Sequence, residues 1–226
     1  MKYVPEIRPQ EADVKGNDGR RPLTTTSFAI LGLLSVRDWS AYEITGQMKR
    51  GLRHSWPRTD TRIYQEPRNL VAHGLASARI TATGRRPRTV YSITDEGRRA
   101  LADWLEEASQ PPQIQSEAVL RATFADAGSK DALLATLAGL RREGRLIQHQ
   151  LGEQAADYVA TGGPFPQRLH LIALVGRFLS DYAQLLEGWA SWAEQVVSSW
   201  PDVATADATT IPSDVFELVI QRAARP

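Results

Sequence analysis

Hydrophobic residues recur at helical spacing in two segments near the start of the chain. The first is FAILGLLSV, which follows the N-cap candidates Thr24–Thr26, and the second is SAYEITGQMKRGL. Apolar residues three or four positions apart lie on one face of a helix, so both segments are predicted to be helices with a buried side. In the second segment we assign this side to Tyr42, Ile44 and Met48.

A third helix is predicted for TRIYQEPRNLVAHG, with Thr59 or Asp60 as its N-cap. Its buried face consists of Ile63, Leu70 and Val71. The residues expected to point outward are Arg62, Tyr64, Gln65, Arg68 and Asn69. Pro67 removes one backbone hydrogen bond, so a bend is expected there, and Gly74 marks the end of the helix.

Two β-like runs follow, LASARITAT (residues 75–83) and RTVYSIT (residues 88–94). Both contain β-branched residues, and the turn-forming cluster GRRP separates them, so they are predicted to form a hairpin. Thr94 then caps a fourth helix, whose first turn contains Asp95 and Glu96 at the positive end of the helix dipole. The order helix, helix, helix, hairpin, helix is that of a winged helix-turn-helix.

The second half of the chain is predicted to be helical. After a linker at residues 109–116, helices are expected from Ser116, from Gly128–Ser129 to Gly162, and from Ser213 to Arg222. A last long helix carries apolar residues spaced alternately four and three positions apart, namely Leu171, Val175, Phe178, Tyr182, Leu185, Trp189, Trp192 and Val196. This 3.5-residue period is typical of a coiled-coil seam, formed within the chain, across a dimer, or both.

Charge is unevenly distributed, although the formal net charge of the 226 residues is only +1. Residues 1–110 carry a net charge of +5 and residues 111–226 a net charge of −4. Residues 49–92 contain 10 basic and 2 acidic residues. Such an imbalance either attracts a polyanionic partner or marks a solvated basic face without a partner.

Composition excludes several kinds of site and compartment. The chain has no cysteine, which excludes disulfides, cysteine-ligated zinc and thiol nucleophiles. Residues 1–22 are polar, lack the apolar core of a signal peptide and are expected to form a flexible arm. The longest apolar segment, near Leu169–Leu186, is interrupted by Arg177 and Asp181, so we predict no membrane span and a cytoplasmic protein.

Catalysis is not predicted. The sequence has no GxSxG, no P-loop and no GxGxxG after a strand, and its four histidines lack a metal-binding spacing. Glu106 and Glu107 are adjacent in sequence, so they point to different helix faces and cannot share a reacting centre. We therefore expect no catalytic residue, no metal site and no cofactor.

DNA binding is the function that a winged helix with a basic surface favours, because its third helix fits the major groove and the wing reaches the flanking backbone. The predicted DNA-binding residues are Arg58, Thr59, Thr61, Arg62, Tyr64, Gln65, Arg68, Asn69, Arg85, Arg86 and Arg88. Three alternatives stay open: Tyr64 packs against the hairpin, Arg68 pairs with Glu66 or Asp60, or the arginine-rich wing is only a solubilising turn. Arg20 and Arg21 either enter a minor groove or belong to a disordered start.

The segments FAILGLLS, SAYEI, RIY and GLASARITATGRRPRTVYSITDEGRRALADWL together resemble the PadR-like transcriptional regulators. The segment SEAVLRATFADAGSKDALLATL resembles the first part of that family's C-terminal helical domain, so the resemblance covers roughly residues 24–200. The resemblance assigns Tyr64 to the recognition helix and the wing arginines to DNA. The chain departs from the family in having Ala41 in place of the usual glycine and Gln65 directly after Tyr64, where the family usually has proline.

The resemblance implies a homodimer that represses transcription and releases a two-fold operator when a small, often aromatic, molecule binds. An effector is expected near the dimer core, at Phe178, Tyr182, Trp189 and Trp192. We predict an arm (residues 1–22), a winged-helix domain (23–110), a helical dimerisation domain (111–200) and a tail (201–226). The alternative function is a winged-helix module for protein–protein contacts that does not bind a specific DNA sequence.

Overall fold

The computed structural model describes residues 20–52, 54–57, 59–83, 86–206 and 214–224 of the chain. The chain divides into two compact units, Met1–Pro111 and Pro112–Pro226.

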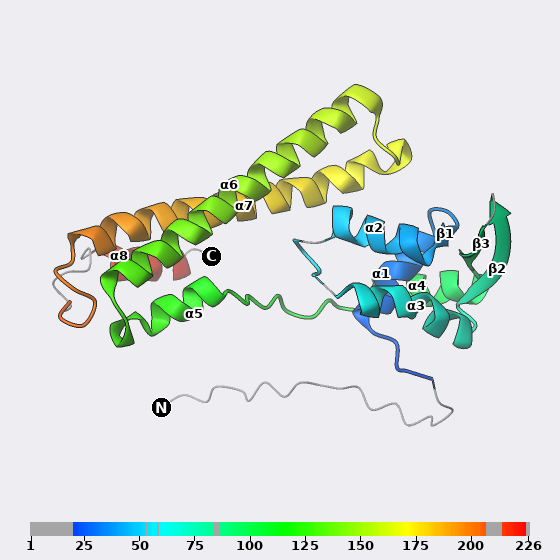
Figure 1. The fold of residues 1–226 in the computed structure, drawn as a ribbon, viewed down its shortest axis with the longest axis horizontal. Coiled ribbons are helices and arrows are strands. Elements are labelled where there is room, and N and C mark those ends of the chain that lie inside the picture. The colour runs from blue at the N-terminus through cyan, green and yellow to red at the C-terminus, as the bar shows by residue number, and fades with distance from the viewer. Residues whose placement is uncertain (1–19, 53, 58, 84–85, 207–213, 225–226) are drawn as a thin grey trace. The chain divides into compact units, whose positions relative to one another are not determined.

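The N-terminal unit is a winged helix (Figure 1). Its elements are α1 (Thr25–Leu34), β1 (Trp39–Ser40), α2 (Ala41–Gly51), α3 (Asp60–Ala72), β2 (Ala76–Thr83), β3 (Arg86–Ile93) and α4 (Asp95–Glu106). The three strands form an antiparallel sheet in the order β1-β3-β2. The predicted fold class is confirmed, with helices around a small β-hairpin wing.

Two details of the sheet differ from the prediction. Strand β1 was not predicted, because two residues are too few to show a β period; it pairs with Tyr91 and Val90 of β3. Strand β3 begins at Arg86, two residues earlier than predicted. As a result Arg88 lies within the strand ladder, opposite Thr81, and not in the turn.

The core of this unit is built from apolar side chains of α1, α2, α3 and the sheet. The buried residues include Ile30, Leu31, Leu34, Trp39, Ile44, Met48, Ile63, Leu70, Leu75, Val90 and Tyr91. Phe28 stacks on Trp104 with ring centroids 5.0 Å apart, which attaches α4 to α1. Ile44 and Met48 of α2 face the core as predicted. The assignment of Tyr42 to the same buried side is wrong, because Tyr42 is 82% exposed.

The base of the wing is held where α3, β2 and α4 meet. Gly74 ends α3 with a φ of 73°, as predicted. The hydroxyl of Thr94 donates to the Gly74 carbonyl at 2.7 Å and accepts from the N–H of Gly97 at 3.0 Å. A Cβ on Gly97 would lie 2.0 Å from the carbonyl oxygen of Leu75, so only glycine lets α4 approach this closely.

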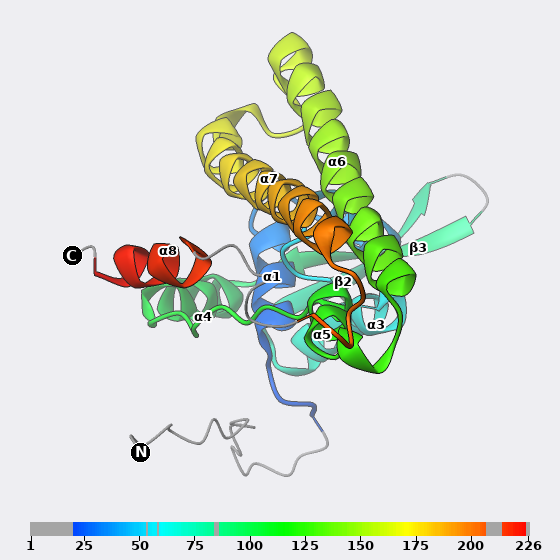
Figure 2. The same cartoon turned by 90° about the vertical axis from the view of Figure 1, so that its left-hand side faces the viewer.

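The C-terminal unit is helical. It contains α5 (Glu117–Thr123), the 3-10 turn η1 (Ala125–Ala127), α6 (Lys130–Thr161), the 3-10 turn η2 (Pro166–Arg168), α7 (Leu169–Ser199) and α8 (Asp214–Ala223). Helices α6 and α7 lie side by side in Figures 1 and 2. Within the described part of the chain, no helix combines the length and the apolarity that a membrane span requires.

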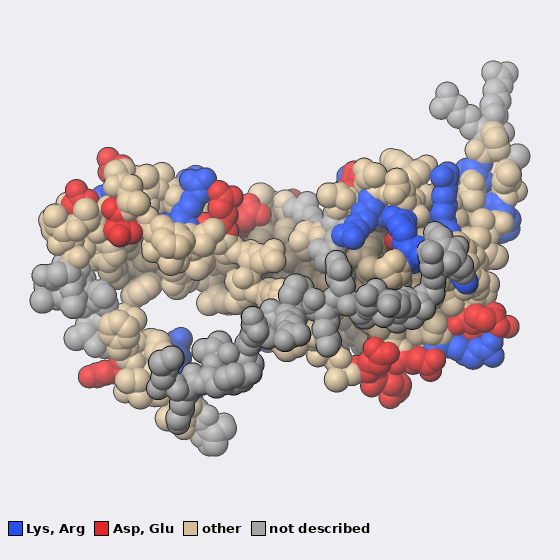
Figure 3. Space-filling view, turned by 90° about the horizontal axis from the view of Figure 1, so that it is seen from below, with Lys and Arg blue, Asp and Glu red and all other residues tan. Residues whose placement is uncertain are grey.

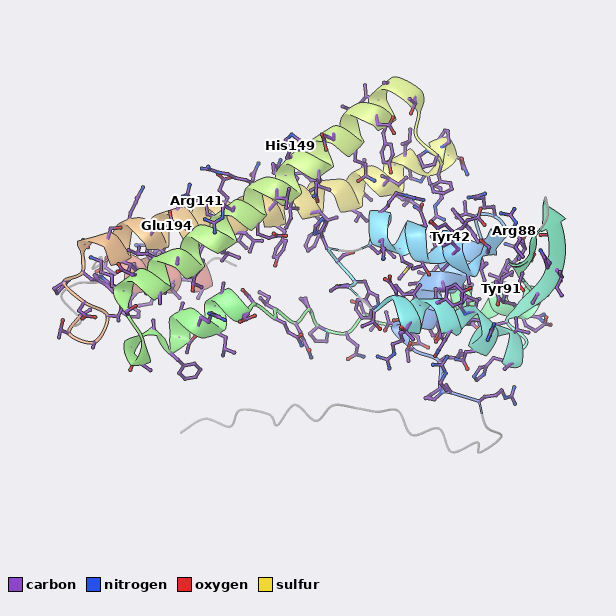
Figure 4. All side chains as sticks on the ribbon, viewed as in Figure 1. Tyr42, Arg88, Tyr91, Arg141, His149 and Glu194 are labelled. Carbon is purple, nitrogen blue, oxygen red and sulfur yellow. The ribbon has the colours of Figure 1, made fainter. Side chains whose placement is uncertain are left out.

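Small residues and ion pairs hold α6 against α7. A Cβ on Gly144 would lie 2.9 Å from the carbonyl oxygen of Ala183, so the two backbones approach closely there. Arg141 of α6 and Glu194 of α7 point toward one another (Figure 4), with Arg141 Nε 3.0 Å from Glu194 Oε2. Arg145 forms a second ion pair, with Glu187 at 2.6 Å.

Helix α7 has two apolar rows, each with a 3.5-residue period. The row that packs on α6 contains Leu179, Ala183, Ala190, Ala193 and Val197, all of which are buried. The predicted seam lies one residue earlier along the helix, so it faces a different direction. Of that seam, Leu171, Val175, Phe178, Leu185 and Trp192 remain between 41% and 66% exposed. The predicted period is therefore present, but within one chain the seam leaves these five side chains exposed.

Candidate nucleic-acid interface

Helix α3 presents a polar face opposite its buried side. Ile63, Pro67 and Leu70 are buried. At 3.6 residues per turn, Thr61, Gln65 and Arg68 fall in one row on the other side. Arg62, Tyr64, Gln65 and Arg68 are exposed, as predicted, and so are Thr59 and Thr61 at the start of the helix.

Asn69 is an exception, and the prediction that it points outward is wrong. Asn69 is buried, and its amide donates to Glu66 Oε1 at 3.0 Å. The same oxygen accepts a hydrogen bond from the hydroxyl of Ser27 at 2.7 Å. Because a buried carboxylate needs hydrogen-bond donors, Glu66 draws the Asn69 side chain toward α1 and away from solvent.

A hollow of about 570 Å³ lies between α2 and α3. Tyr42 and Tyr64 line it together with Lys49 and Arg50, which were not among the predicted DNA-binding residues. Lys49 also pairs with Asp60 at 2.6 Å. The excess of basic residues over positions 49–92 was the only sequence signal for these two cations.

The alternatives for Arg68 and Tyr64 can be compared with this geometry. Glu66 pairs with Arg21 and Asp60 pairs with Lys49, so within the described residues neither acid is paired with Arg68. Tyr64 is 52% exposed and lies beside α2.

The wing contributes Arg88, which is labelled in Figure 4; its Nη1 lies 3.9 Å from Oε2 of Glu43 in α2. The backbone N–H of Ser40 and its hydroxyl both donate to this carboxylate and hold the pKa of Glu43 below its usual value. The charges of Arg88 and Arg37 act in the same direction. The predicted DNA-binding residues Arg58 and Arg85, and the side chain of Arg86, lie outside the described residues.

The distribution of charge over the surface follows the sequence. Figure 3 shows a group of lysine and arginine side chains over the N-terminal unit, separate from a group of acidic ones. In the C-terminal unit, acidic side chains are the more prominent on this face. Arg62 and Arg68 add positive charge to the exposed side of α3, which is suited to a polyanion.

The C-terminal unit contains a separate cavity of about 430 Å³, between the α5–η1 segment and the end of the α6–α7 pair. Trp189 and Trp192 line it, as does Trp200. Phe178 and Tyr182, which were predicted to share a pocket with these tryptophans, are not among its lining residues. Along α7, Phe178 lies about three turns before Trp189 and Tyr182 about two turns before it.

The winged segment can now be compared with known proteins. Residues 30–103 match the model of the Transcriptional regulator PadR-like family. The chain carries a PadR-like domain. Over 99 residues it is 34% identical to the negative transcriptional regulator PadR of Bacillus subtilis. The matched segment covers 43% of this chain and 54% of that protein. The chain spans about half the length of the curated relatives it matches.

Solved structures extend the similarity beyond the PadR-like domain. Bacillus subtilis PadR in complex with operator DNA has a TM-score of 0.66 at 23% identity, covering 77% of this chain and 99% of that one. The same protein in complex with p-coumaric acid has a TM-score of 0.60 at 22% identity, covering 78% and 100%. The Vibrio cholerae virulence activator AphA has a TM-score of 0.57 at 26% identity, covering 76% and 96%. The helices that follow the PadR-like domain therefore belong to the shared fold.

Proposed function

We propose that this protein is a DNA-binding transcriptional regulator that acts in the cytoplasm as a homodimeric repressor, and that it is not an enzyme. The observation that carries the proposal is the exposed polar face of α3, with Arg62, Gln65 and Arg68, in a PadR-like domain. The relative that matches this domain is a negative regulator, and its structure holds operator DNA.

Dimensions and chemistry support α3 as the element that enters the major groove. An α-helix with its side chains is about 10–12 Å across, and the major groove is about 12 Å wide. Arginine reads guanine through two parallel hydrogen bonds, and glutamine reads adenine in the same way. In this arrangement Arg62, Gln65 and Arg68 contact bases or the adjacent phosphates, Thr59 and Thr61 contact phosphate at the start of α3, and the wing arginines contact the flanking backbone.

Dimerisation is supported by the exposed apolar residues of the predicted seam on α7, namely Leu171, Val175, Phe178 and Leu185. A row of exposed apolar side chains is unfavourable in water. Because these residues recur with a 3.5-residue period, the row suits a second helix with the same repeat. Residues 111–200 would then hold two chains together, so that two copies of the domain at residues 23–110 face two half-sites. A two-fold operator follows from the two-fold symmetry of such a dimer.

An aromatic effector is supported by the cavity in the C-terminal unit. Trp189 and Trp192 offer aromatic faces there, and the volume of about 430 Å³ is within the range that small ligands occupy. The relative of known structure binds p-coumaric acid, a small aromatic acid. We place the effector at this cavity and not at Phe178 and Tyr182, because these two residues do not line it.

The test is a DNA-binding titration. Fluorescence anisotropy is measured with a labelled duplex from the region upstream of the protein's own gene, at two salt concentrations. The variant Arg62→Ala/Arg68→Ala is compared with Arg98→Ala/Arg99→Ala, which makes the same change in charge on α4. We expect binding that weakens with salt, a loss in the α3 variant and little change in the control; no binding by the unmodified protein would overturn the proposal and favour a protein–protein module.

A further inference from the structure

Arg20 and Arg21 are fixed to α3, although they precede α1 in the sequence. The guanidinium of Arg20 donates to the carbonyl of Ala72 at 3.2 Å. The carbonyl of Arg21 lies 2.8 Å from His73 Nε2. The side chain of Arg21 reaches Glu66, with Nη2 3.7 Å from Oε2. We call Arg20 and Arg21, held by these three contacts, the N-terminal clip.

Glu66 explains why the clip forms at this point. Its carboxylate is almost completely buried, and Ser27 and Asn69 both donate to one of its oxygens. A buried carboxylate is favourable only when donors and a cation compensate for its lost hydration. Arg21 provides a cation beside the second oxygen while half of its own side chain stays exposed to solvent.

The clip lies beside the polar face of α3. At 3.6 residues per turn, Glu66 and His73 fall more than a quarter of a turn from the centre of the row of Gln65 and Arg68, and Asn69 lies between them and that row. The clip therefore runs along one flank of α3, and the hollow with Tyr42 and Lys49 is on the other flank.

The clip and α3 together form a basic hollow. It has a volume of about 360 Å³ and is lined by Arg20, Arg21, Gln65, Arg68, Asn69 and Ala72. Arg20, Arg21 and Arg68 contribute three guanidinium groups to its lining, and none of the described lining residues is acidic; Glu66 lies buried behind Arg21. Arg20 and Arg21 are both exposed, and a guanidinium has five N–H donors, so an acceptor in the solvent can reach these side chains. An anion is the chemical complement of such a surface.

We infer that the N-terminal clip binds backbone phosphates of duplex DNA, on the strand that borders the groove occupied by α3. The inference rests on the proposed function, since it places α3 in the major groove. A segment on the flank of a groove-bound helix faces the phosphates that form the groove wall and not the base edges. Arg20 and Arg21 thus add affinity and fix the position of α3, and they contribute no direct base recognition.

The experiment measures how the DNA affinity of the full chain depends on salt. The probe is the labelled duplex from the region upstream of the protein's own gene. Arg20→Ala/Arg21→Ala is compared with Arg98→Ala/Arg99→Ala, an adjacent pair with the same change in charge. The slope of log affinity against log salt changes by about 0.9 for each phosphate that the protein no longer neutralises. A dimer in which each subunit neutralises one or two fewer phosphates should have a slope shallower by about 1.8 to 3.6.

Two further variants separate phosphate binding from an effect on folding. Arg20→Lys/Arg21→Lys keeps both charges, so it should keep most of the salt slope. Arg20→Ala alone leaves the pair of Arg21 with Glu66 intact and should reduce the slope by about 0.9 per subunit. Hydrogen exchange of α3 reports whether each variant keeps the fold.

The outcomes distinguish this inference from the function on which it rests. Between 50 and 200 mM salt, the unmodified protein should lose roughly 12- to 150-fold more affinity than the double alanine variant. If the unmodified protein binds with a steep salt dependence and both alanine variants keep that slope, the clip does not contact phosphate, although the protein binds DNA. If the unmodified protein binds no DNA, both the inference and the proposed function are wrong.

Discussion

Replacing Gly97 with alanine is expected to destabilise the PadR-like domain, although alanine is the better helix former. The new Cβ would lie 2.0 Å from the carbonyl oxygen of Leu75 and 2.9 Å from Ile93 Cγ1. Non-bonded heavy atoms are most stable at about 3.5–4.0 Å, so α4 must move by roughly 1.5 Å or the start of β2 must give way. The backbone of Leu75 cannot turn aside as the end of a flexible side chain can.

The magnitude follows from two opposing terms. Overpacking costs about 1–3 kcal/mol, and a clash with backbone belongs at the upper end. Alanine regains about 1 kcal/mol of helix propensity over glycine. The free energy of unfolding of the domain therefore falls by about 2 kcal/mol, which corresponds to roughly a 30-fold increase in the population of its unfolded form.

Hydrogen exchange with mass spectrometry measures this effect separately in each unit. Peptides from β2 and α4 should exchange roughly 30-fold faster in Gly97→Ala. The matched control is Gly32→Ala in α1, where a Cβ would meet nothing within 4 Å, and it should slow exchange in the same domain. Unchanged exchange in Gly97→Ala would refute the close approach of α4 to Leu75.

Three further predictions concern other parts of the molecule. Ser27→Ala removes a donor from the buried carboxylate of Glu66, so the free energy of unfolding should fall by about 2 kcal/mol in urea denaturation; a change below half of that would contradict the buried network. The folded-state pKa of Glu43 is lowered from 4.5, so its contribution to stability is present above that pH and is lost as the pH falls through the folded value. Glu43→Gln should therefore reduce the loss of stability on acidification below about pH 4.5, measured by thermal melting across that range, and an identical pH profile would count against it. Phe178→Asp, at a side chain 66% exposed in the single chain, should give a folded monomer in sedimentation, and an unchanged dimer would exclude this row from the interface.

The sequence predicted the local features of the winged helix well because they depend on neighbouring residues. The end of α3 at Gly74 and the cap of α4 at Thr94 are determined by backbone conformation and short-range hydrogen bonds. The hairpin follows from β-branched residues around a turn cluster. The order of these elements was then sufficient for the fold class.

The features that the sequence did not predict depend on residues far apart in the chain. Asn69 is buried because Glu66 and Ser27 meet, and Ser27 lies 39 residues from Glu66. The clip likewise joins residues 52 positions apart. Helical periodicity places a residue on a face, but it cannot show that a distant segment covers that face.

The long helix α7 shows a related limit. Its two rows have the same period and differ by one residue, so the period alone does not say which row packs within the chain. The small side chains of Ala183, Ala190 and Ala193 decide this, because they allow α6 to approach closely. In the other row, Leu171, Val175, Phe178 and Leu185 stay exposed within the single chain.

The most direct test of the proposed function is the affinity of the full chain for the own-gene upstream duplex as a function of salt. The proposal predicts two chains bound per duplex and a linear fall of log affinity with log salt, with a slope of about −0.9 for each phosphate neutralised. Arg62→Ala/Arg68→Ala should weaken binding while Arg98→Ala/Arg99→Ala binds as the unmodified protein does. Absence of binding, or an affinity that does not change with salt, would contradict the proposal that α3 carries DNA recognition.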